Sequence, residues 1–178
     1  GELLSRNKPL TAKDRLAIPP QEMPAQRPEV RRDKISEVAL GYSEAQARLE
    51  AMRCLQCRNQ PCVSGCPVAI DIPGFVQAIA DADYPKAIAI IKRNSLLPAI
   101  CGRICTHPCE DACRRAEVDA PLAIRDIKRY VADHGTIRDF PSAQRQKRSQ
   151  RSQRIAVIGS GPAGLSAAAD LARHGFGV

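Results

Sequence analysis

The sequence has few aromatic side chains, because its 178 residues include three Tyr, three Phe and no Trp. Its core must therefore consist mostly of Ala, Ile, Leu and Val, and a further source of stability must supplement the packing of these side chains. The sequence also lacks an apolar run of the roughly 18 to 20 residues that a membrane-spanning helix needs. Its N-terminal segment, GELLSRNKPLTAKDR, has no apolar centre like that of a signal peptide. These absences predict a cytoplasmic protein with no membrane span.

Acidic residues are the minority charge, since 27 Lys and Arg stand against 19 Asp and Glu, a formal net charge of +8. Much of the excess lies in residues 145–154, RQKRSQRSQR, which hold five basic residues and no acidic one. Without aromatic side chains for base stacking, this run is most simply a solvated linker. RNA or a negatively charged protein partner is the alternative. The net charge alone does not identify a partner, and we predict no nucleic-acid partner.

Helical signals dominate the first part of the chain. Ser43 and Gln46 form an S-x-x-Q capping box, which predicts a helix that ends next to Cys54. The apolar residues of that helix, at helical spacing, are Ala45, Leu49 and Met52. Further helices are predicted over Pro73–Ala82, Tyr84–Arg93 and Pro121–Asp133, the last with Ile124, Ile127 and Val131 on one face.

All eight cysteines fall into two dense groups. The groups are Cys54-x2-Cys57-x4-Cys62-x3-Cys66 and Cys101-x3-Cys105-x3-Cys109-x3-Cys113. A 4Fe-4S cluster needs four converging thiolates, and a short loop delivers two or three of them while a distant Cys completes the site. In the bacterial ferredoxin pattern, the Cys before a Pro ligates the other cluster, and Cys66-Pro67 has that form. We therefore predict two 4Fe-4S clusters with ligands exchanged between the groups.

Three other uses of the cysteines compete with iron–sulfur clusters. A disulfide scaffold suits an even cysteine count, but no secretion signal supports it. Zinc uses C-x2-C half-sites, yet zinc sites usually pair two such knuckles, unlike the dense groups here. A redox dithiol needs only one C-x-x-C pair. His107 is an alternative ligand of the Rieske kind, but with four cysteines nearby we expect it to hydrogen-bond to backbone or to sulfide.

A glycine motif follows the first apolar strand-like run, Ile155–Ile158. Its residues are Gly159, Ser160, Gly161, Pro162, Ala163 and Gly164. A helix is predicted over Leu165–Arg173, ending at His174 and Gly175. Strand, G-x-G-x-x-G turn and helix together predict the pyrophosphate-binding turn of a dinucleotide-binding fold. The acidic residue expected about 20 residues further on would fall beyond Val178, so binding is predicted for a longer parent protein.

Residues 43–178 resemble the N-terminal half of the glutamate synthase small (beta) subunit family. The matching segments are EAMRCLQC (50–57), CVSGCP (62–67), DIPGF (71–75), PAICGRIC (98–105), CE (109–110), AIRDIKRY (123–130) and the glycine turn. The same superfamily includes the N-terminal part of dihydropyrimidine dehydrogenase and the large subunit of NADH-dependent ferredoxin:NADP oxidoreductase. Similar subunits are attached to formate dehydrogenases and hydrogenases.

The resemblance implies an oxidoreductase subunit that passes electrons between NAD(P)H, FAD, two 4Fe-4S clusters and a redox partner. That partner would be a glutamate synthase large subunit, a ferredoxin, or a subunit of the hydrogenase or formate dehydrogenase type. FAD would bind at Gly159–Gly164, and NAD(P)H in a domain beyond this chain. The fragment itself contains no group for bond-making chemistry and is not expected to be catalytic alone. The runner-up hypothesis is a zinc-stabilised helical interaction module fused to a nucleotide-binding domain.

The resemblance also implies a ligand set for each cluster. One cluster would take Cys54, Cys57, Cys62 and Cys113, and the other would take Cys66, Cys105 and Cys109. In several relatives the fourth ligand of the second cluster is a Gln or Glu, but the matching residue here is Lys128. A protonated ammonium has no lone pair for iron. We therefore predict that Cys101 supplies the missing thiolate.

These observations predict a mainly α fold. A helical two-cluster domain of the alpha-helical ferredoxin type is followed by the first β-α unit of a Rossmann-type FAD/NAD(P)-binding domain. The predicted boundaries are an extended N-terminal arm at 1–35, the iron–sulfur domain at 36–142, a basic linker at 143–154 and the truncated nucleotide-binding unit at 155–178.

Overall fold

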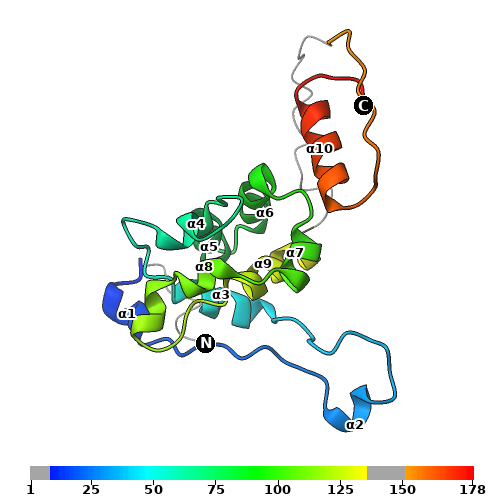
Figure 1. Ribbon diagram of the computed structural model, residues 1–178. Helices are drawn as coiled ribbons and strands as arrows, with labels where there is room; N and C mark the ends of the chain where they lie inside the picture. The colour runs from blue at the N-terminus through cyan, green and yellow to red at the C-terminus, as the bar shows by residue number, and fades with distance from the viewer. Residues whose placement is uncertain (1–8, 136–150) are drawn as a thin grey trace. The chain divides into compact units, whose positions relative to one another are not determined.

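A computed structural model of the chain describes residues 9–135 and 151–178. The chain divides into two compact units, Gly1–Thr136 and Ile137–Val178. Within residues 9–135, the regular secondary structure is helical, with one isolated antiparallel bridge between Ala25 and Ala39 (Figure 1). The prediction of a mainly α fold is therefore confirmed. The predicted basic linker falls mostly on residues 136–150, outside the described residues.

The helices of the first unit are mostly short. In chain order they are α1 (Ala12–Leu16), α2 (Pro28–Arg31), α3 (Glu44–Met52), α4 (Pro61–Ser64), α5 (Ile72–Ala80), α6 (Tyr84–Asn94), α7 (Pro98–Ile104), α8 (Pro108–Asp111), the 3₁₀-helix η2 (Arg114–Glu117) and α9 (Ile124–His134). None of the helices described in this chain has the length and apolar character of a membrane span.

Helix α3 begins where the capping box predicts. The Ser43 hydroxyl accepts a hydrogen bond from the Gln46 amide at 3.3 Å, and the Gln46 side chain accepts one from the Ser43 amide at 3.1 Å. The predicted apolar face is only partly right, because Met52 is buried but Ala45 is exposed. The buried face also includes Ala47 and Glu50. Glu50 turns inward to accept hydrogen bonds from distant segments, and a hydropathy pattern cannot register a buried carboxylate of this kind.

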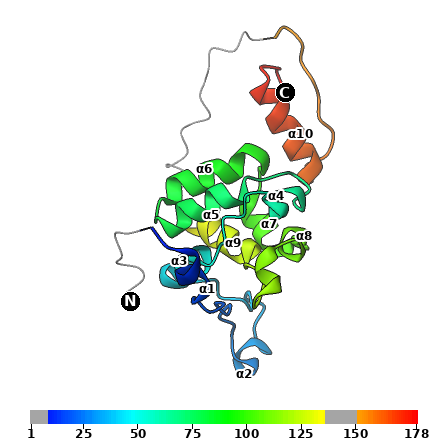
Figure 2. The ribbon, with the colours of Figure 1, turned by 90° about the vertical axis from the view of Figure 1, so that its left-hand side faces the viewer.

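The core lies where α5, α6 and α9 meet (Figure 2). Its fully buried side chains include Phe75, Val76, Ile79, Ile88, Ile91, Ile127 and Val131. The predicted common face of α9 is confirmed, since Ile124, Ile127 and Val131 are all buried. Helix α9 starts three residues later than predicted from Pro121, because the N-cap residue Ala123 has a non-helical backbone conformation. Its amide donates to the Glu50 carboxylate at 2.9 Å.

Helix α7 was not predicted, and it packs closely against α9. A Cβ atom on Gly102 would lie 2.9 Å from both the Cα and the Cβ atom of Arg129. Real Cβ atoms essentially never approach that closely. Glycine at position 102 therefore lets two helix backbones meet, and this contact places Cys101 and Cys105 beside α9.

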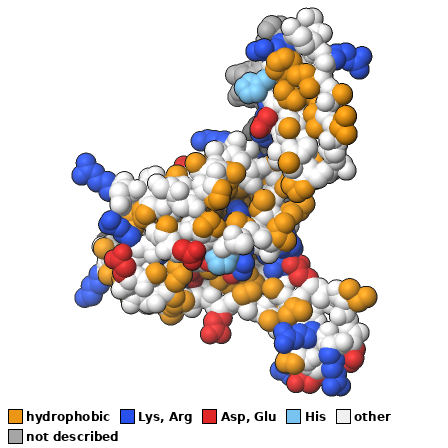
Figure 3. All heavy atoms as spheres, in the orientation of Figure 1, with side chains coloured by type: hydrophobic (Ala, Val, Ile, Leu, Met, Phe, Trp, Pro, Cys, Tyr) orange, Lys and Arg blue, Asp and Glu red, His pale blue; other side chains and the backbone are white. Residues whose placement is uncertain are grey.

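Residues 23–41 form a hairpin that extends from the helical unit, with α2 near its tip (Figures 1 and 2). Arg129 connects its base to the helices by donating to the Ala39 carbonyl at 2.9 Å. Figure 3 shows basic and acidic side chains side by side around α2. Over the face drawn there, cations alternate with carboxylates rather than forming a single basic surface.

The second unit contains α10 (Pro162–Arg173), which begins three residues before the predicted helix. The predicted strand over Ile155–Ile158 does not form as a regular strand. In the described part of this unit, pairing is limited to a parallel bridge between Arg154 and Gly177, with the Ile155 amide donating to the Gly177 carbonyl at 2.8 Å. A strand requires a neighbouring strand for its backbone groups, and only residues 175–177 supply one here.

The close α7–α9 contact leads to a stability prediction. The substitution Gly102→Ala should lower the free energy of unfolding by about 1–3 kcal/mol, because the added methyl group meets helix backbone that cannot rotate away. Denaturant unfolding followed by helical circular dichroism measures the change. Ile100→Ala, at an exposed position of the same helix, is the control and should change it by no more than about 0.5 kcal/mol. Equal effects for the two variants would contradict the close contact.

Candidate metal-cluster sites

Two short helices present cysteines with the same local geometry. Before α4, Gln60 adopts a left-handed conformation with φ 43°, and Pro61 opens the helix directly before Cys62. Before α8, His107 has φ 48°, and Pro108 opens the helix directly before Cys109. Proline suits the first helical position because its missing amide hydrogen is not needed there. The two cysteine groups are therefore related in structure as well as in spacing.

Helices α4 and α8 pack against each other at their C-terminal ends. A Cβ atom on Gly65 would lie 3.0 Å from the Cβ atom of Ala112 and 3.3 Å from the Cα atom of Cys109. Gly65 and Ala112 occupy matching positions, each directly before the last cysteine of its group. This contact brings Cys66 to the side of α8 and Cys113 to the side of α4, as exchange of ligands requires.

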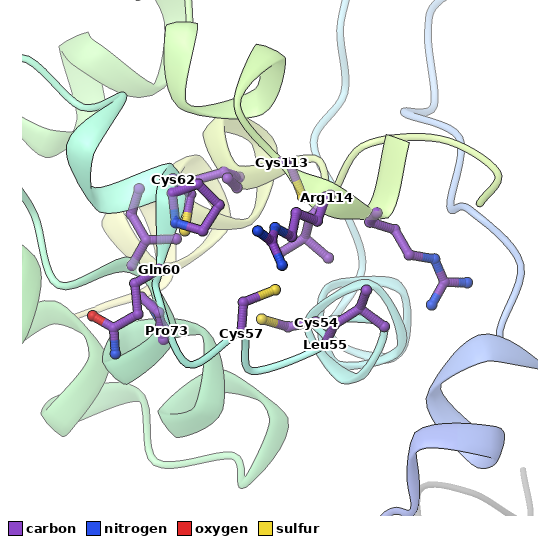
Figure 4. A pocket seen from close by; sticks show the side chains of 13 residues that line it. Cys54, Leu55, Cys57, Gln60, Cys62, Pro73, Cys113 and Arg114 are labelled. Atoms are coloured by element: carbon purple, nitrogen blue, oxygen red, sulfur yellow. The ribbon is translucent and has the colours of Figure 1, made fainter. Parts of the chain in front are cut away.

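The first candidate site is a pocket of about 400 Å³, open mouth included. Four cysteines line it: Cys54, Cys57, Cys62 and Cys113 (Figure 4). Three of them belong to the first cysteine group and the fourth to the second. Apolar side chains of Ile72, Leu122 and Ile124 complete much of the wall. The pocket thus gathers the same four thiols that the family resemblance implies for one cluster.

Burial raises the pKa of two thiols of this pocket, Cys54 and Cys62. It raises the pKa of Cys62 to about 11, with the neighbouring Cys54 and Cys113 contributing in the same direction. Burial also raises the pKa of Cys54, while a hydrogen bond from the Gln56 backbone opposes the rise. Thiols must lose their protons to bind a metal, so a cluster that binds in this pocket would have to displace the thiol protons.

The second candidate site lies around Cys109, which is 8% exposed. Burial, together with the charges of Glu110, Cys66 and Cys105, raises the pKa of the Cys109 thiol to about 12. Gly65, which directly precedes Cys66, lies against α8, since a Cβ atom there would be 3.3 Å from the Cys109 Cα atom. The His107 backbone amide donates to the Cys105 sulfur at 3.3 Å. Three cysteines of the predicted second site thus lie in this region: Cys66 after α4, Cys105 at the C-terminal end of α7 and Cys109 in α8.

Cys101 lies on α7, one helical turn before Cys105. The Cys105 amide donates to the Cys101 carbonyl at 3.2 Å, and residues four apart share a helix face. On the adjacent α9, Lys128 is 7% exposed and its charge lowers the pKa of Cys109. Lys128, the residue that the family resemblance compares with a Gln or Glu ligand, is therefore a buried lysine.

His107 lies beside the second site through its backbone rather than its ring. Its Nδ1 atom is 3.3 Å from a Glu110 carboxylate oxygen, without the alignment of a hydrogen bond. Burial raises the pKa of Glu110, while the hydrogen bond that it accepts from the Arg125 amide at 2.8 Å opposes the rise. In the described residues, no three Cys, His, Asp or Glu side chains form a group suited to a single metal ion.

Two buried arginines next to the first site escaped the sequence analysis. Arg53 is 0% and Arg115 is 1% exposed, and both reach Asp119. The hydrogen bond from Arg115 is the largest of the influences that hold the pKa of Asp119 below its usual range. A signal was available, because Arg53 directly precedes Cys54 and Arg115 follows Cys113 by two residues.

The predicted glycine turn lies at the start of α10. Gly159 has φ +113°, a conformation that other residues rarely adopt. A Cβ atom on Gly164 would overlap the Gly159 carbonyl oxygen. Gly161 has no such neighbour, and open space of this kind suits a ligand's approach. The turn therefore has two glycines that its own backbone requires and a third that it does not.

Comparison with known proteins identifies an iron–sulfur family. Residues 31–139 match the family model described as dihydropyrimidine dehydrogenase domain II, 4Fe-4S cluster. The NADP(+)-dependent formate dehydrogenase subunit beta of Moorella thermoacetica is 40% identical over 138 residues, covering 66% of this chain and 20% of the relative. The NADPH-Fe(3+) oxidoreductase subunit beta of Geobacter sulfurreducens is 39% identical over 116 residues, covering 65% of this chain and 17% of the relative.

A third relative covers more of the chain. The NAD-dependent dihydropyrimidine dehydrogenase subunit PreT of Escherichia coli K12 is 33% identical over 146 residues, which are 81% of this chain and 35% of the relative. The chain thus spans only about a fifth to a third of the relatives that it matches. Because the matched model covers residues 31–139, more than half of the sequence, the chain belongs to the dihydropyrimidine dehydrogenase domain II, 4Fe-4S cluster family.

Proposed function

We propose that this chain is the electron-transfer part of an NAD(P)H-dependent oxidoreductase subunit and holds two 4Fe-4S clusters. The observation that carries the proposal is the pocket lined by four cysteines from both cysteine groups. The family match and the names of the relatives, which are subunits of NAD- and NADP-linked redox enzymes, support it. When bound, such clusters supply one-electron transfer. The chain's own residues hold them and exclude water.

The first cluster would be held by Cys54, Cys57, Cys62 and Cys113. Their thiols fit this role because they line one pocket whose walls are largely apolar. The second would be held by Cys66, Cys101, Cys105 and Cys109. Two observations support this ligand set. The charges of Cys66 and Cys105 act on the pKa of Cys109. Cys101 and Cys105 share a helix face.

Lys128 gives the second site a different charge from a site completed by an amide. A fourth thiolate adds one negative charge, which favours a lower reduction potential. The buried ammonium of Lys128 opposes this effect, because a nearby cation stabilises the more negative, reduced state. We propose that Lys128 compensates the charge of Cys101 rather than acting as a ligand.

FAD and NAD(P)H belong to the longer protein in this proposal. The positive φ of Gly159 and the close approach of Gly164 to its carbonyl support a dinucleotide turn at the start of α10. The partner is proposed to be another redox subunit or domain. The relatives' names include formate dehydrogenase, Fe(3+) oxidoreductase and dihydropyrimidine dehydrogenase subunits, and a glutamate synthase large subunit remains one candidate.

The composition of the purified chain tests the central proposal. Anaerobic purification should give a brown protein absorbing near about 400 nm, with about eight iron atoms and eight sulfides per chain. The zinc-stabilised alternative expects a colourless protein with stoichiometric zinc and no iron. That result would overturn the cluster proposal while leaving the helical fold unchanged.

A pair of variants tests the role of Cys101. Cys101→Ala should remove the second cluster, so that iron falls from about eight to about four atoms per chain. Adding Lys128→Gln to that variant should restore iron, because the amide can replace the missing ligand. Iron analysis and EPR after reduction measure both effects.

Ile100→Ala, next to Cys101 and exposed, is the matched control and should keep all the iron. Unchanged iron and EPR spectra in Cys101→Ala would show that Cys101 is not a ligand.

A further inference from the structure

The segment from Arg15 to Ile18 lies against the loop that carries Cys54, although the two are far apart in sequence. Arg15 donates to the Cys54 carbonyl at 2.8 Å, and Ile18 is only 1% exposed. The segment therefore packs onto the helical unit directly beside the first candidate site. The matched family model begins at residue 31 and does not include it.

Arg115 connects this segment to both sides of the pocket. It is fully buried and lies two residues after Cys113 in η2. Its guanidinium donates to the Arg53 carbonyl, next to Cys54, at 3.2 Å and to the Arg15 carbonyl at 2.8 Å. It also donates to the carbonyls of Leu16 at 3.2 Å and Ile18 at 3.1 Å.

Asp119 holds this guanidinium in place. Its two carboxylate oxygens accept from Arg115 Nε at 2.6 Å and Nη2 at 2.7 Å, a bidentate pair. The same carboxylate accepts from Arg53 Nη2 at 3.1 Å, and Arg53 also pairs with Glu50 on α3. All the donors of Arg115 are thus directed at protein groups, and its orientation is determined on every side.

Cys113 is the one ligand of the first pocket that comes from the second cysteine group. Cys62 is the nearest of the other three cysteines in sequence, and the whole segment 62–113 separates it from Cys113. Non-covalent contacts must therefore hold Cys113 at the pocket. Arg115 makes such contacts, because it joins the η2 backbone beside Cys113 to the backbone beside Cys54. Arg15 strengthens the same junction by donating to the carbonyls of Met52 and Cys54.

We infer that Arg115 is a positioning residue for the first cluster. Through its hydrogen bonds to the backbone of residues 15–18 and of Arg53, it holds Cys113 next to the loop that carries Cys54. We call this set of hydrogen bonds the clasp. This inference rests on the proposed function, because it concerns how one of the two proposed clusters is retained. It assigns to residues 15–18 a part in the cluster site, as the third segment of the clasp. The second site contains none of these contacts and should not depend on them.

The test compares Arg115→Met with Arg93→Met in the anaerobically purified chain. Methionine is unbranched and keeps much of the apolar stem but removes every donor. Arg93 is an exposed arginine on α6, a helix that carries none of the eight cysteines. Arg115→Met should lose the EPR signal that Cys57→Ala also loses, and about half of the iron. Arg93→Met should retain the iron and both signals.

A second variant keeps all cations in place. Ile18→Ala loosens the apolar anchor of residues 15–18, and on exposure to air it should lose the first cluster several-fold faster than the unmodified chain does. Its second cluster should decay at the unmodified rate. This measurement remains informative if Arg115→Met does not accumulate as folded protein.

Three outcomes would overturn the inference. Full iron and an unchanged decay rate of the first cluster in both variants would show that the clasp is not needed. Equal loss of both clusters in Arg115→Met and equal acceleration of both decays in Ile18→Ala would show a general folding role. An unmodified chain without iron would overturn the proposed function itself, which is distinguishable because it appears before any substitution is made.

Discussion

The contact between α4 and α8 is the constraint on which both candidate sites depend. Each helix places one cysteine in its first turn and is followed by a second cysteine beside the other helix. The contact is close because Gly65 has no side chain to separate the two helices. With the helices in contact, the last cysteine of each group, Cys66 or Cys113, lies beside the helix of the other group. The cysteine groups thus form one paired structure rather than two independent loops.

The surrounding helices convert that contact into two different environments. The first site opens as a pocket with apolar walls and is bordered by the buried pair Arg53 and Arg115. The second is packed against α9, and Lys128 of α9 and Glu110 of α8 have opposite effects on the pKa of Cys109. Buried charges near a redox centre influence the relative stability of its oxidised and reduced states. The two sites therefore have the means to differ in reduction potential even with the same ligands.

Sequence reasoning succeeded where short patterns determine structure. The capping box at Ser43 located α3, and the apolar spacing in Ile124, Ile127 and Val131 identified the buried face of α9. It failed where distant groups decide the outcome. The buried face of α3 includes the inward-facing Glu50 and leaves the expected Ala45 exposed. Helix α7 was missed because its packing depends on a glycine that weakens a helix taken alone.

The candidate site shows the same division. Cysteine spacing and the family resemblance predicted ligand sets that include Cys113 with the first group, and the structure places that residue in the first pocket. The two buried arginines stand next to cysteines in the sequence, but the partners of Arg115 could not be predicted, because they include backbone carbonyls about a hundred residues away. The strand at Ile155–Ile158 was predicted from its own residues, whereas strand formation also needs a neighbour.

The exchange of ligands between the cysteine groups is the central claim, and one spectroscopic comparison tests it most directly. Single alanine substitutions of Cys57, Cys105 and Cys113 are each examined by EPR after reduction. The account predicts that Cys113→Ala loses the same signal as Cys57→Ala and keeps the one that Cys105→Ala loses. If Cys113→Ala instead loses the same signal as Cys105→Ala, each cysteine group binds its own cluster and the account is contradicted.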